Sequence, residues 1–313
     1  MTAAERDTTE LVEQVARLFY EEQLPKIEIA ARLAISRFRV ARLIDRALAE
    51  GIVRIEFRSA PGQDRALGAA IVERYGIGRC VVASSSEPMA VARLAAEVVD
   101  GLLEPGESIG IAWGSTLARV VRAMPVRDDP TIDVVQLAGS SPRLGSDADP
   151  GDLTRVLAER LGATHHRMHA PAFVDSPELR AALVRLPDVA GVVSRFTDLA
   201  IALLGIGAFG GAGGASSSLI RSGALSAAEA ARLSRKGAVG DLLVHPFTAT
   251  GRFLAPDLAA RALAIGIEDL RRIPSVVAVA SGSAKVAAIR GALATGLPGV
   301  LVTSAATAQE LLA

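Results

Sequence analysis

The chain has 313 residues, half of them hydrophobic, and its 34 basic side chains are balanced by 34 acidic ones. This length suggests about two domains with a large buried core, and the zero net charge excludes a protein that coats nucleic acid over its whole surface. The single cysteine, Cys80, excludes a disulfide framework and a cysteine-based zinc site.

The first predicted element is an amphipathic helix over residues 11–22, which ends before Pro25. No N-terminal segment resembles a signal peptide, and no apolar run along the chain reaches the length needed to cross a membrane. We therefore expect a cytoplasmic protein with no membrane partner.

Residues 26–57 have the pattern of a winged helix-turn-helix: a short helix, a tight turn, a longer helix over residues 36–50 and a charged, wing-like strand over residues 52–57. Ser36 stands at the N-cap position of the longer helix, and Gly51 stands where a helix ends in the left-handed conformation. The apolar residues of this helix recur at the spacing of one buried face: Val40, Leu43, Ile44, Ala47 and Leu48.

The other face of the longer helix is basic, because residues 32–46 contain five arginines and one acid. A recognition helix lies in the major groove, where arginine can bind guanine, while flanking arginines contact phosphates. The alternative is a solvated basic face of a small bundle, which the cap, the glycine stop and the wing disfavour. We predict that Arg37, Phe38 and Arg42 reach base edges and that Arg39 and Arg46 flank them toward the phosphates.

A stretch of proline, glycine and polar residues follows, so we predict a DNA-binding domain over residues 1–58 and a second domain over residues 59–313. The second domain opens with a helix over residues 65–75 and then alternates strand-like and helical runs. Several strand-like runs are apolar on both faces, which is typical of a parallel sheet covered by helices on both sides. We therefore predict a doubly wound, mostly parallel α/β domain, with strands over residues 79–83, 108–112, 132–138, 164–169, 199–205, 239–245, 276–280 and 300–303 and helices over residues 91–103, 116–124, 153–161, 227–235 and 284–294.

Such sheets bind ligands where a strand ends and a helix begins. Gly114, Ser115 and Thr116 occupy one of these junctions. The glycine lets the backbone approach a ligand, and the two hydroxyl groups add donors to the free amides of the helix start, which suits a phosphate group. An ordinary capped turn is the alternative interpretation of this junction.

Two further junctions and one loop add candidate ligands for an anion. Residues 205–210 have the G-x-G-x-x-G spacing, but they do not open a helix and no acid follows about 20 residues later, so Gly207 marks a ligand loop and no dinucleotide cofactor is expected. Lys285 follows the strand over residues 276–280 by about one turn. Arg143 lies in the polar loop after the strand over residues 132–138 and can pair with an anion.

Two catalytic interpretations are poorly supported. His165 and His169 share a face of one extended run but lie about 13 Å apart along it, and no acid or cysteine completes a metal site with them and His166. No G-x-S-x-G elbow of a serine hydrolase occurs. We expect no metal ion and no cofactor.

With these motifs the chain is similar to the SorC family of bacterial transcriptional regulators, also described as DeoR-like sugar-binding regulators. The resemblance extends from about Leu11 to Leu312. In the N-terminal part it depends on EIAARLAISRFRVARLIDRALAEGIVRI, and in the second domain on GIAWGSTLARVV, VVQLAG, APAFVDSPELRAAL, DLAIALLGIG, LIRSGALS, GAVGDLL, IEDLRRIPSVVAVASGSAKVAAIRGAL and LVTSAATAQELL.

The resemblance implies a homo-oligomeric repressor or activator, usually a tetramer. Its second domain is expected to resemble sugar-phosphate isomerases and CoA transferases but to act as a sensor of phosphorylated sugars. The family motifs fall on Gly114, Ser115, Thr116, Gly207, Asp241 and Lys285, and in a more variable loop on Arg143, so the resemblance implies that these residues bind the effector.

The chain departs from the family pattern at two motifs. Thr248 stands where the family commonly has the acid of F-F-D-x-x-G, and Ser304 and Ala305 stand where it commonly has the two acids of T-D-E-x-T-A. If these positions line the pocket, we expect a more anionic or less hydroxylated effector, such as a polyol phosphate or a sugar acid. Otherwise they face solvent or a subunit interface.

The sequence favours a DNA-binding regulator of a carbohydrate-metabolism operon that is controlled by a phosphosugar or related metabolite and is not an enzyme. Its expected partners are double-stranded operator DNA and further copies of the chain, as a dimer or tetramer. The alternative is a sugar-phosphate isomerase with an appended helical module. An isomerase needs a positioned base and has no use for a basic recognition helix.

Overall fold

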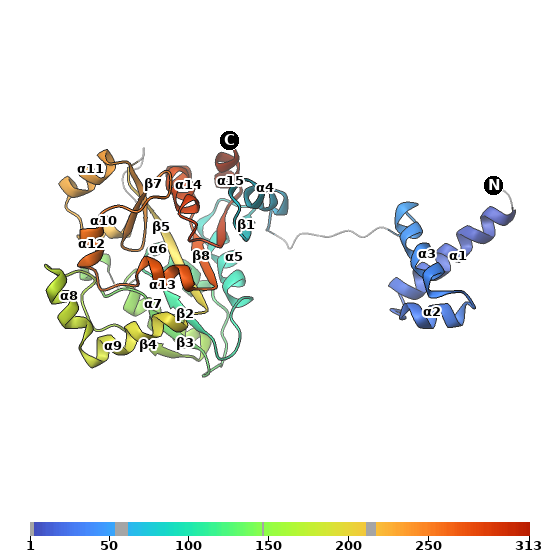
Figure 1. Cartoon of the computed structure of the whole chain (residues 1–313), viewed down its shortest axis with the longest axis horizontal. Helices are drawn as coiled ribbons and strands as arrows, with labels where there is room; N and C mark the ends of the chain where they lie inside the picture. Colours follow the sequence, from blue (N-terminus) through green and yellow to red (C-terminus); the bar gives the residue numbers. More distant parts are fainter. Residues whose placement is uncertain (1–2, 54–61, 146, 211–216) are drawn as a thin grey trace. The chain divides into compact units, whose positions relative to one another are not determined.

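The structure, a computed structural model, describes residues 3–53, 62–145, 147–210 and 217–313, and within residues 3–9 the backbone alone. The chain divides into two compact units, Met1–Arg58 and Ser59–Ala313 (Figure 1). Each unit has a hydrophobic core of its own.

The smaller unit contains three helices, α1 (Ala3–Tyr20), α2 (Lys26–Arg32) and α3 (Arg37–Ala49). Side chains from all three helices pack into one cluster, because each helix has an apolar stripe at helical spacing. The buried members of the cluster are Val12, Val15, Ala16, Leu18, Ile29, Val40, Leu43, Ile44 and Ala47. α2 and α3 lie over the residues that were predicted to form the helix-turn-helix pair.

Both ends of α3 have the predicted caps. The hydroxyl oxygen of Ser36 accepts a hydrogen bond from the backbone amide of Arg39 at 3.2 Å, and Gly51 is left-handed with a φ of 69°. The turn between α2 and α3 also contains a left-handed residue, Ala34, with a φ of 52°. A side chain is strained in this conformation, and glycine is not.

Two expectations for this unit need correction. Leu48 was expected on the buried face of α3, but it is 40% exposed, because at 3.6 residues per turn it points about 80° away from Val40. Ile52 and Val53, at the start of the expected wing, form a bend and not a strand. Residues 54–57, the rest of that wing, lie outside the described residues.

The larger unit is organised around a sheet in the order β1-β9-β8-β5-β2-β3-β4, and every pairing along this order is parallel. The predicted doubly wound α/β class is therefore confirmed. Some strands are shorter than predicted, such as those expected over residues 132–138 and 164–169. The strands are β1 (Arg79–Ala83), β2 (Ser108–Ile111), β3 (Asp133–Gln136), β4 (Thr164–His166), β5 (Ile201–Ala208), β8 (Ser275–Val279) and β9 (Val300–Ser304).

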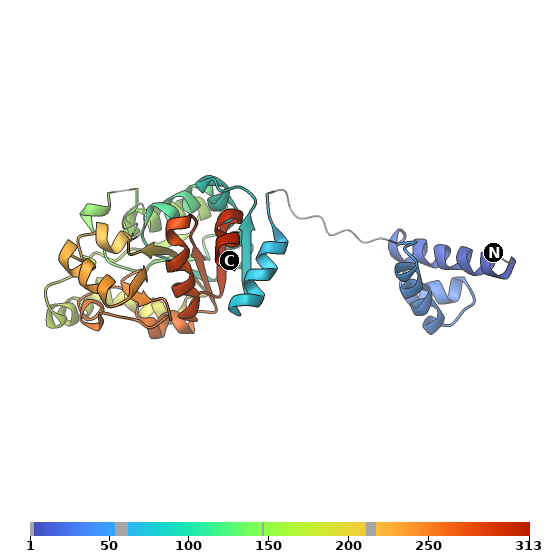
Figure 2. The same cartoon turned by 90° about the horizontal axis from the view of Figure 1, so that it is seen from above.

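Helices cover both faces of this sheet (Figure 2). The chain passes from β1 through β2 and β3 to β4 toward one edge, whereas it passes from β5 through β8 to β9 toward the other edge. Because such crossovers are right-handed, the two series of connecting helices lie on opposite faces. The helices are α4 (Arg65–Tyr75), α5 (Pro88–Asp100), α6 (Ser115–Ala123), α7 (Pro150–Leu161), α8 (Pro177–Val184), α9 (Pro187–Val193), α10 (Ser218–Arg221), α11 (Ala227–Arg235), α12 (Pro256–Ala260), α13 (Ile267–Arg272), α14 (Val286–Ala294) and α15 (Ala305–Leu312), with 3-10 turns η1 (Pro142–Leu144), η2 (Ser194–Asp198) and η3 (Ser283–Lys285).

An antiparallel hairpin extends the carboxyl end of β5. A single strand was predicted over residues 239–245, but the structure has β6 (Ala238–Leu242) paired with β5 and β7 (His245–Thr248) paired with β6. Leu243 between them is left-handed, with a φ of 58°. The apolar run continues through this turn, so hydropathy alone gave no sign of it.

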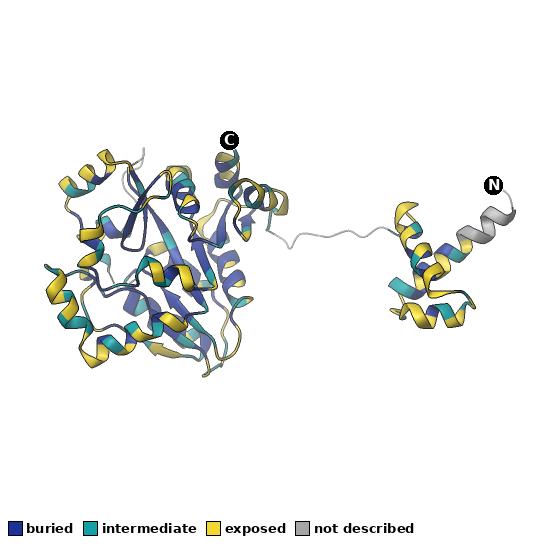
Figure 3. Cartoon of the chain, in the orientation of Figure 1, coloured by how far each residue is buried: buried dark blue, intermediate teal, exposed yellow. Residues whose placement is uncertain are grey.

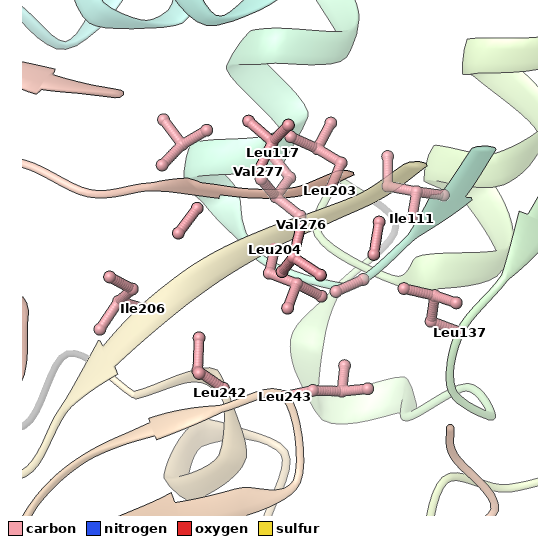
Figure 4. Close-up of a cluster of buried hydrophobic side chains, with 14 of the residues drawn as sticks. Ile111, Leu117, Leu137, Leu203, Leu204, Ile206, Leu242, Leu243, Val276 and Val277 are labelled. Carbon is pink, nitrogen blue, oxygen red and sulfur yellow. The ribbon is translucent and has the colours of Figure 1, made fainter. Parts of the chain in front are cut away.

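The core of the larger unit lies around the central strands, which are buried on both faces (Figure 3). Side chains from β2, β5, β8 and α6 meet there (Figure 4). None of the described helices is both long and apolar enough to cross a membrane.

Candidate functional site

A small pocket lies at the carboxyl edge of the sheet, beside β2 and β5. From β2 the chain continues to β3 on one side, and from β5 it continues through the β6–β7 hairpin to β8 on the other side. These neighbouring strands therefore form the switch point at which parallel sheets leave a crevice for ligands. The described residues that line the pocket are Ala112, Trp113, Ser115, Thr116, Gly205, Ile206, Gly207, Ser218, Asp241, Leu243 and Lys285.

The start of α6 forms one wall of the pocket. Gly114, just before it, has a φ of 122° and a ψ of 153°, a combination that is essentially restricted to glycine. No side chain among the described residues caps α6. Its first amides therefore add to the hydroxyl donors of Ser115 and Thr116, and a helix N-terminus with such donors suits an anion.

Asp241 lines the pocket from β6. It pairs in register with Gly207, is only 2% exposed, and its Oδ1 atom has no hydrogen-bond partner among the described residues. Burial raises the pKa of Asp241 to about 7, against the opposing effects of a hydrogen bond from Ser217 and the charge of Lys285. A buried acceptor without a partner is costly, so a ligand that donates a hydrogen bond to Oδ1 would remove this cost.

Lys285 reaches the pocket from the turn after β8, and its Nζ atom donates a hydrogen bond to the carbonyl oxygen of Ile206 at 2.8 Å. Burial lowers the pKa of Lys285, the negative charge of Asp241 raises it, and the positive charges of Arg221 and Arg119 lower it further. Three basic side chains thus act on a pocket that contains one carboxyl group. This charge balance favours an anionic ligand.

The size of the pocket limits what it can hold. Its free volume is about 40 Å³, whereas a single water needs about 10–15 Å³ on this measure. The pocket therefore has room for a small group such as a phosphate, but not for a whole dinucleotide.

The structure brings together most of the residues that the sequence singled out for effector binding. Ser115, Thr116, Gly207, Asp241 and Lys285 line this one pocket, and Gly114 directly precedes its α6 wall. Arg143 is not among the lining residues. It lies in η1, exposed, with its guanidinium group over Gly223 beyond α10.

The positions of the missing family acids are also not among the lining residues. Thr248 is buried in β7. Its hydroxyl group is hydrogen-bonded to the hydroxyl group of Thr250 at 3.0 Å and accepts a hydrogen bond from the backbone amide of Arg252 at 3.2 Å. Ser304 caps α15, and its hydroxyl group lies 2.9 Å from that of Thr307. Their hydroxyl groups therefore serve local structure, and the expectation of a less hydroxylated effector loses its basis.

Sequence reasoning missed several residues of the site. Ser217 and Ser218 open α10, and Arg119 and Arg221 act on Lys285 electrostatically. The spacing of α6 could have pointed to Arg119, because it stands four residues after Ser115 and donates to its carbonyl oxygen at 3.3 Å. No local pattern links α10 to this edge of the sheet.

A larger hollow of about 640 Å³ lies beside α11 and α12. The charged side chains that line it are all exposed or partly exposed: Glu229, Arg232, Lys236, Arg252, Asp257 and Arg261. None of its described side chains has a buried polar atom without a partner, whereas Asp241 in the smaller pocket does. We therefore take the smaller pocket as the candidate ligand site.

The histidine run contributes to the sheet edge. The Nε2 atom of His166 lies 2.6 Å from Oδ1 of Asp133, and Arg195 donates to Oδ2 of the same carboxylate at 3.2 Å. These contacts connect the edge strand β4 to β3 and η2. Within the described part of the chain, no group of three or more acidic, histidine or cysteine side chains is arranged to hold a metal ion.

The helix-turn-helix unit presents the second candidate interface. Arg37, Phe38, Arg39 and Arg42 are all exposed on α3. Arg46 is half-buried, and its guanidinium group pairs with Glu50 one turn later. Four of the five side chains predicted to contact DNA are thus exposed on one short helix, and the fifth is engaged by an acid.

Comparisons with known proteins cover nearly the whole chain. Residues 60–313 match the family model Sugar-bind, described as "Putative sugar-binding domain". The sorbitol operon regulator of Klebsiella pneumoniae is 30% identical over 98% of this chain and 98% of that protein, and the erythritol catabolism regulatory protein EryD of Brucella abortus is 30% identical over 96% and 95%. The crystal structure of the full-length sorbitol operon regulator SorC from Klebsiella pneumoniae is similar with a TM-score of 0.74 at 28% identity, over 97% of this chain and 99% of that one.

Proposed function

The chain belongs to the SorC family of transcriptional regulators that carry a sugar-binding domain, and we propose that it controls a carbohydrate-metabolism operon in response to a phosphorylated metabolite. The metabolite is a phosphosugar, and its phosphate group is bound in the pocket beside β2 and β5. Target DNA is bound by α3 of the smaller unit. The protein acts in the cytoplasm, where operator DNA is found.

The observation that carries the effector part is the joint position of Asp241, Lys285 and the α6 N-terminus in one small pocket. The hydroxyl groups of Ser115 and Thr116, the first amides of α6 and the ammonium group of Lys285 are donors for a phosphate. The Oδ1 atom of Asp241, which has no hydrogen-bond partner in the part of the chain that the structure describes, is an acceptor for a hydroxyl group. Together they fit a molecule with a phosphate at one end and a hydroxyl group nearby.

The assignment of the chain as a regulator without enzymatic activity is part of the proposal. A sugar-phosphate isomerase needs a base of tuned pKa, and burial does raise the pKa of Asp241 to about 7. The similar proteins are named as regulators, however, and the exposed arginines of α3 suit DNA. Assembly into a dimer or tetramer is proposed because two recognition helices are needed to read a two-fold symmetric operator.

The test uses the full-length protein and a library of random-sequence duplexes. We expect selection to enrich one sequence, and we expect Arg42→Ala to weaken binding to it by about 1–3 kcal/mol and to relax the preference at one base pair. A panel of sugar phosphates is then added to the enriched complex. The expected result is that one member changes the DNA affinity and is recovered unchanged.

Two outcomes would contradict the proposal. Failure to enrich any sequence would remove the DNA-binding part. Conversion of a panel member into an isomer, or release of its phosphate, would support the enzyme alternative instead.

A further inference from the structure

α2 and α3 share an exposed apolar surface beside their N-termini. Ile27 is 68% exposed and Phe38 is 69% exposed, more than any other large hydrophobic side chain described in the smaller unit. They line one hollow of about 410 Å³ together with Pro25, Lys26, Arg37 and Ala41. We name this surface the Phe38 hollow. Neither Ile27 nor Phe38 belongs to the hydrophobic cluster of the unit, so packing within the unit does not explain them.

The charges around the Phe38 hollow indicate which kind of partner binds there. Lys26 and Arg37 line it directly, and Arg39 and Arg42 are exposed on the same helix. The guanidinium group of Arg37 lies over the Phe38 ring, 5.0 Å from its centroid, a cation–π contact that holds the ring at the helix start. An apolar surface inside a cluster of positive charge is complementary to a polyanion that also displays apolar groups.

The major groove of DNA is such a surface. The 5-methyl group of thymine is the apolar group that base pairs present there, and phenylalanine and alanine are among the side chains that contact it. Phe38 is the second residue of α3, and Ala41 follows one turn later on the same side. Both therefore stand on the part of a recognition helix that reaches base edges.

We propose that Phe38, with Ile27 and Ala41 beside it, contacts the methyl group of a thymine in each half of the operator. This inference rests on the proposed function, because it requires α3 to lie in the major groove. It adds a base identity to that function: one thymine per half-site is read through its methyl group and not only through hydrogen bonds.

The experiment removes single methyl groups from the DNA. Full-length protein is used to enrich a duplex from the random library, and each thymine of that duplex is then replaced in turn by deoxyuridine, which differs from thymidine only in the methyl group. Dissociation constants are measured by fluorescence anisotropy at one fixed salt concentration. The proteins compared are the wild type, Phe38→Ala and the control Leu48→Ala, which truncates an exposed side chain of α3 outside the Phe38 hollow.

When deoxyuridine replaces one particular thymine of each half-site, the affinity of the wild type for the duplex is expected to fall about fourfold. This fall corresponds to the free energy of burying one methyl group. Phe38→Ala should bind the thymine and deoxyuridine duplexes equally, and Leu48→Ala should discriminate like the wild type. Phe38→Leu, which keeps an apolar side chain, should retain part of the discrimination. Because Phe38 is exposed, Phe38→Ala and Phe38→Leu are expected to melt at the wild-type temperature.

Equal wild-type affinities for thymine and deoxyuridine at every position would overturn the inference and leave the proposed function standing. Persistent discrimination in Phe38→Ala would also overturn it. If Phe38→Ala changed the sedimentation mass but not the discrimination, the Phe38 hollow would be a contact between copies of the chain. Failure of the wild type to enrich any duplex would instead contradict the proposed function itself.

Discussion

Gly207 and Asp241 face each other across the β5–β6 pairing so closely that a β-carbon on Gly207 would overlap the carboxyl group of Asp241. The glycine is thus what allows a carboxyl group to be buried at the carboxyl edge of β5. The position of the Asp241 carboxyl group, which is proposed to bind a hydroxyl group of the ligand, therefore depends on the absence of a side chain at Gly207.

This relationship predicts that Gly207→Ala lowers the free energy of unfolding by about 1–3 kcal/mol, the usual cost of overpacking a buried site. Gly205→Ala is the matched control on the same strand, because its β-carbon position has no atom within 4 Å from any described residue other than Gly205 and its two chain neighbours. Urea unfolding of both variants measures the difference. In the double variant Gly207→Ala/Asp241→Ala the overlap is gone. The free energy of unfolding that the double variant loses should therefore be smaller than the sum of the losses in the two single variants. Additive losses would show that the overlap is not the cause.

The raised pKa of Asp241 predicts a stability that depends on pH. In the unfolded chain this carboxyl group ionises near its usual pKa of 3.8, whereas in the folded protein it ionises near pH 7. Between these values the folded protein holds a proton that the unfolded chain has released, so the free energy of unfolding falls as pH rises and the loss is complete above about pH 7.

Asp241→Asn cannot ionise and should lack this loss. The free energy of unfolding of the variant, relative to that of the wild type, is therefore expected to rise between pH 4 and pH 7 by at most about 4 kcal/mol, at 1.36 kcal/mol per pKa unit. Denaturant unfolding of both proteins at several pH values across this window measures it. Two curves that run parallel would contradict burial as the cause of the shift.

Lys285 is expected to carry most of the response to a phosphorylated effector. A ligand at about 100 times its dissociation constant should stabilise the wild type by roughly 2.7 kcal/mol, seen as a higher melting temperature, and Lys285→Ala should lose most of this gain. Lys236→Ala is the control, since Lys236 is exposed and is not among the residues that line the pocket. Trp113, the only tryptophan, lines the pocket and allows the same titrations to be followed by fluorescence. An unchanged response in Lys285→Ala would exclude the ammonium group as a ligand.

The left-handed Ala34 in the turn between α2 and α3 predicts a stabilising substitution. A side chain in this conformation costs about 1–2 kcal/mol, and the greater freedom of glycine in the unfolded chain offsets about half of that. Ala34→Gly should therefore stabilise the smaller unit by about 0.5–1 kcal/mol. Ala31→Gly, inside α2, should destabilise it by about 1 kcal/mol. Hydrogen exchange of the α3 amides in the full-length protein measures the stability change of each variant. If Ala34→Gly and Ala31→Gly changed the stability in the same direction, the strain at Ala34 would be contradicted.

The sequence alone determined the features that depend on near neighbours. The Ser36 cap and the Gly51 stop of α3 depend on residues within one turn, and the bounds of α4 and α11 agree with the predicted ranges to the residue. The parallel α/β class followed from strand-like runs that are apolar on both faces. The family resemblance supplied the candidate pocket residues, because their motifs recur in a fixed order.

Only the tertiary structure decided which candidates meet. Ser115, Asp241 and Lys285 come from three separate elements, and they reach one pocket because β2, β5 and β8 are adjacent in the sheet and β6 folds back on the end of β5. The same packing buries Thr248 in β7 and leaves Arg143 over Gly223. Strand register and packing over the whole unit decide which distant residues come together. The free energy that favours one arrangement comes from the folded core as a whole and not from any local run of residues.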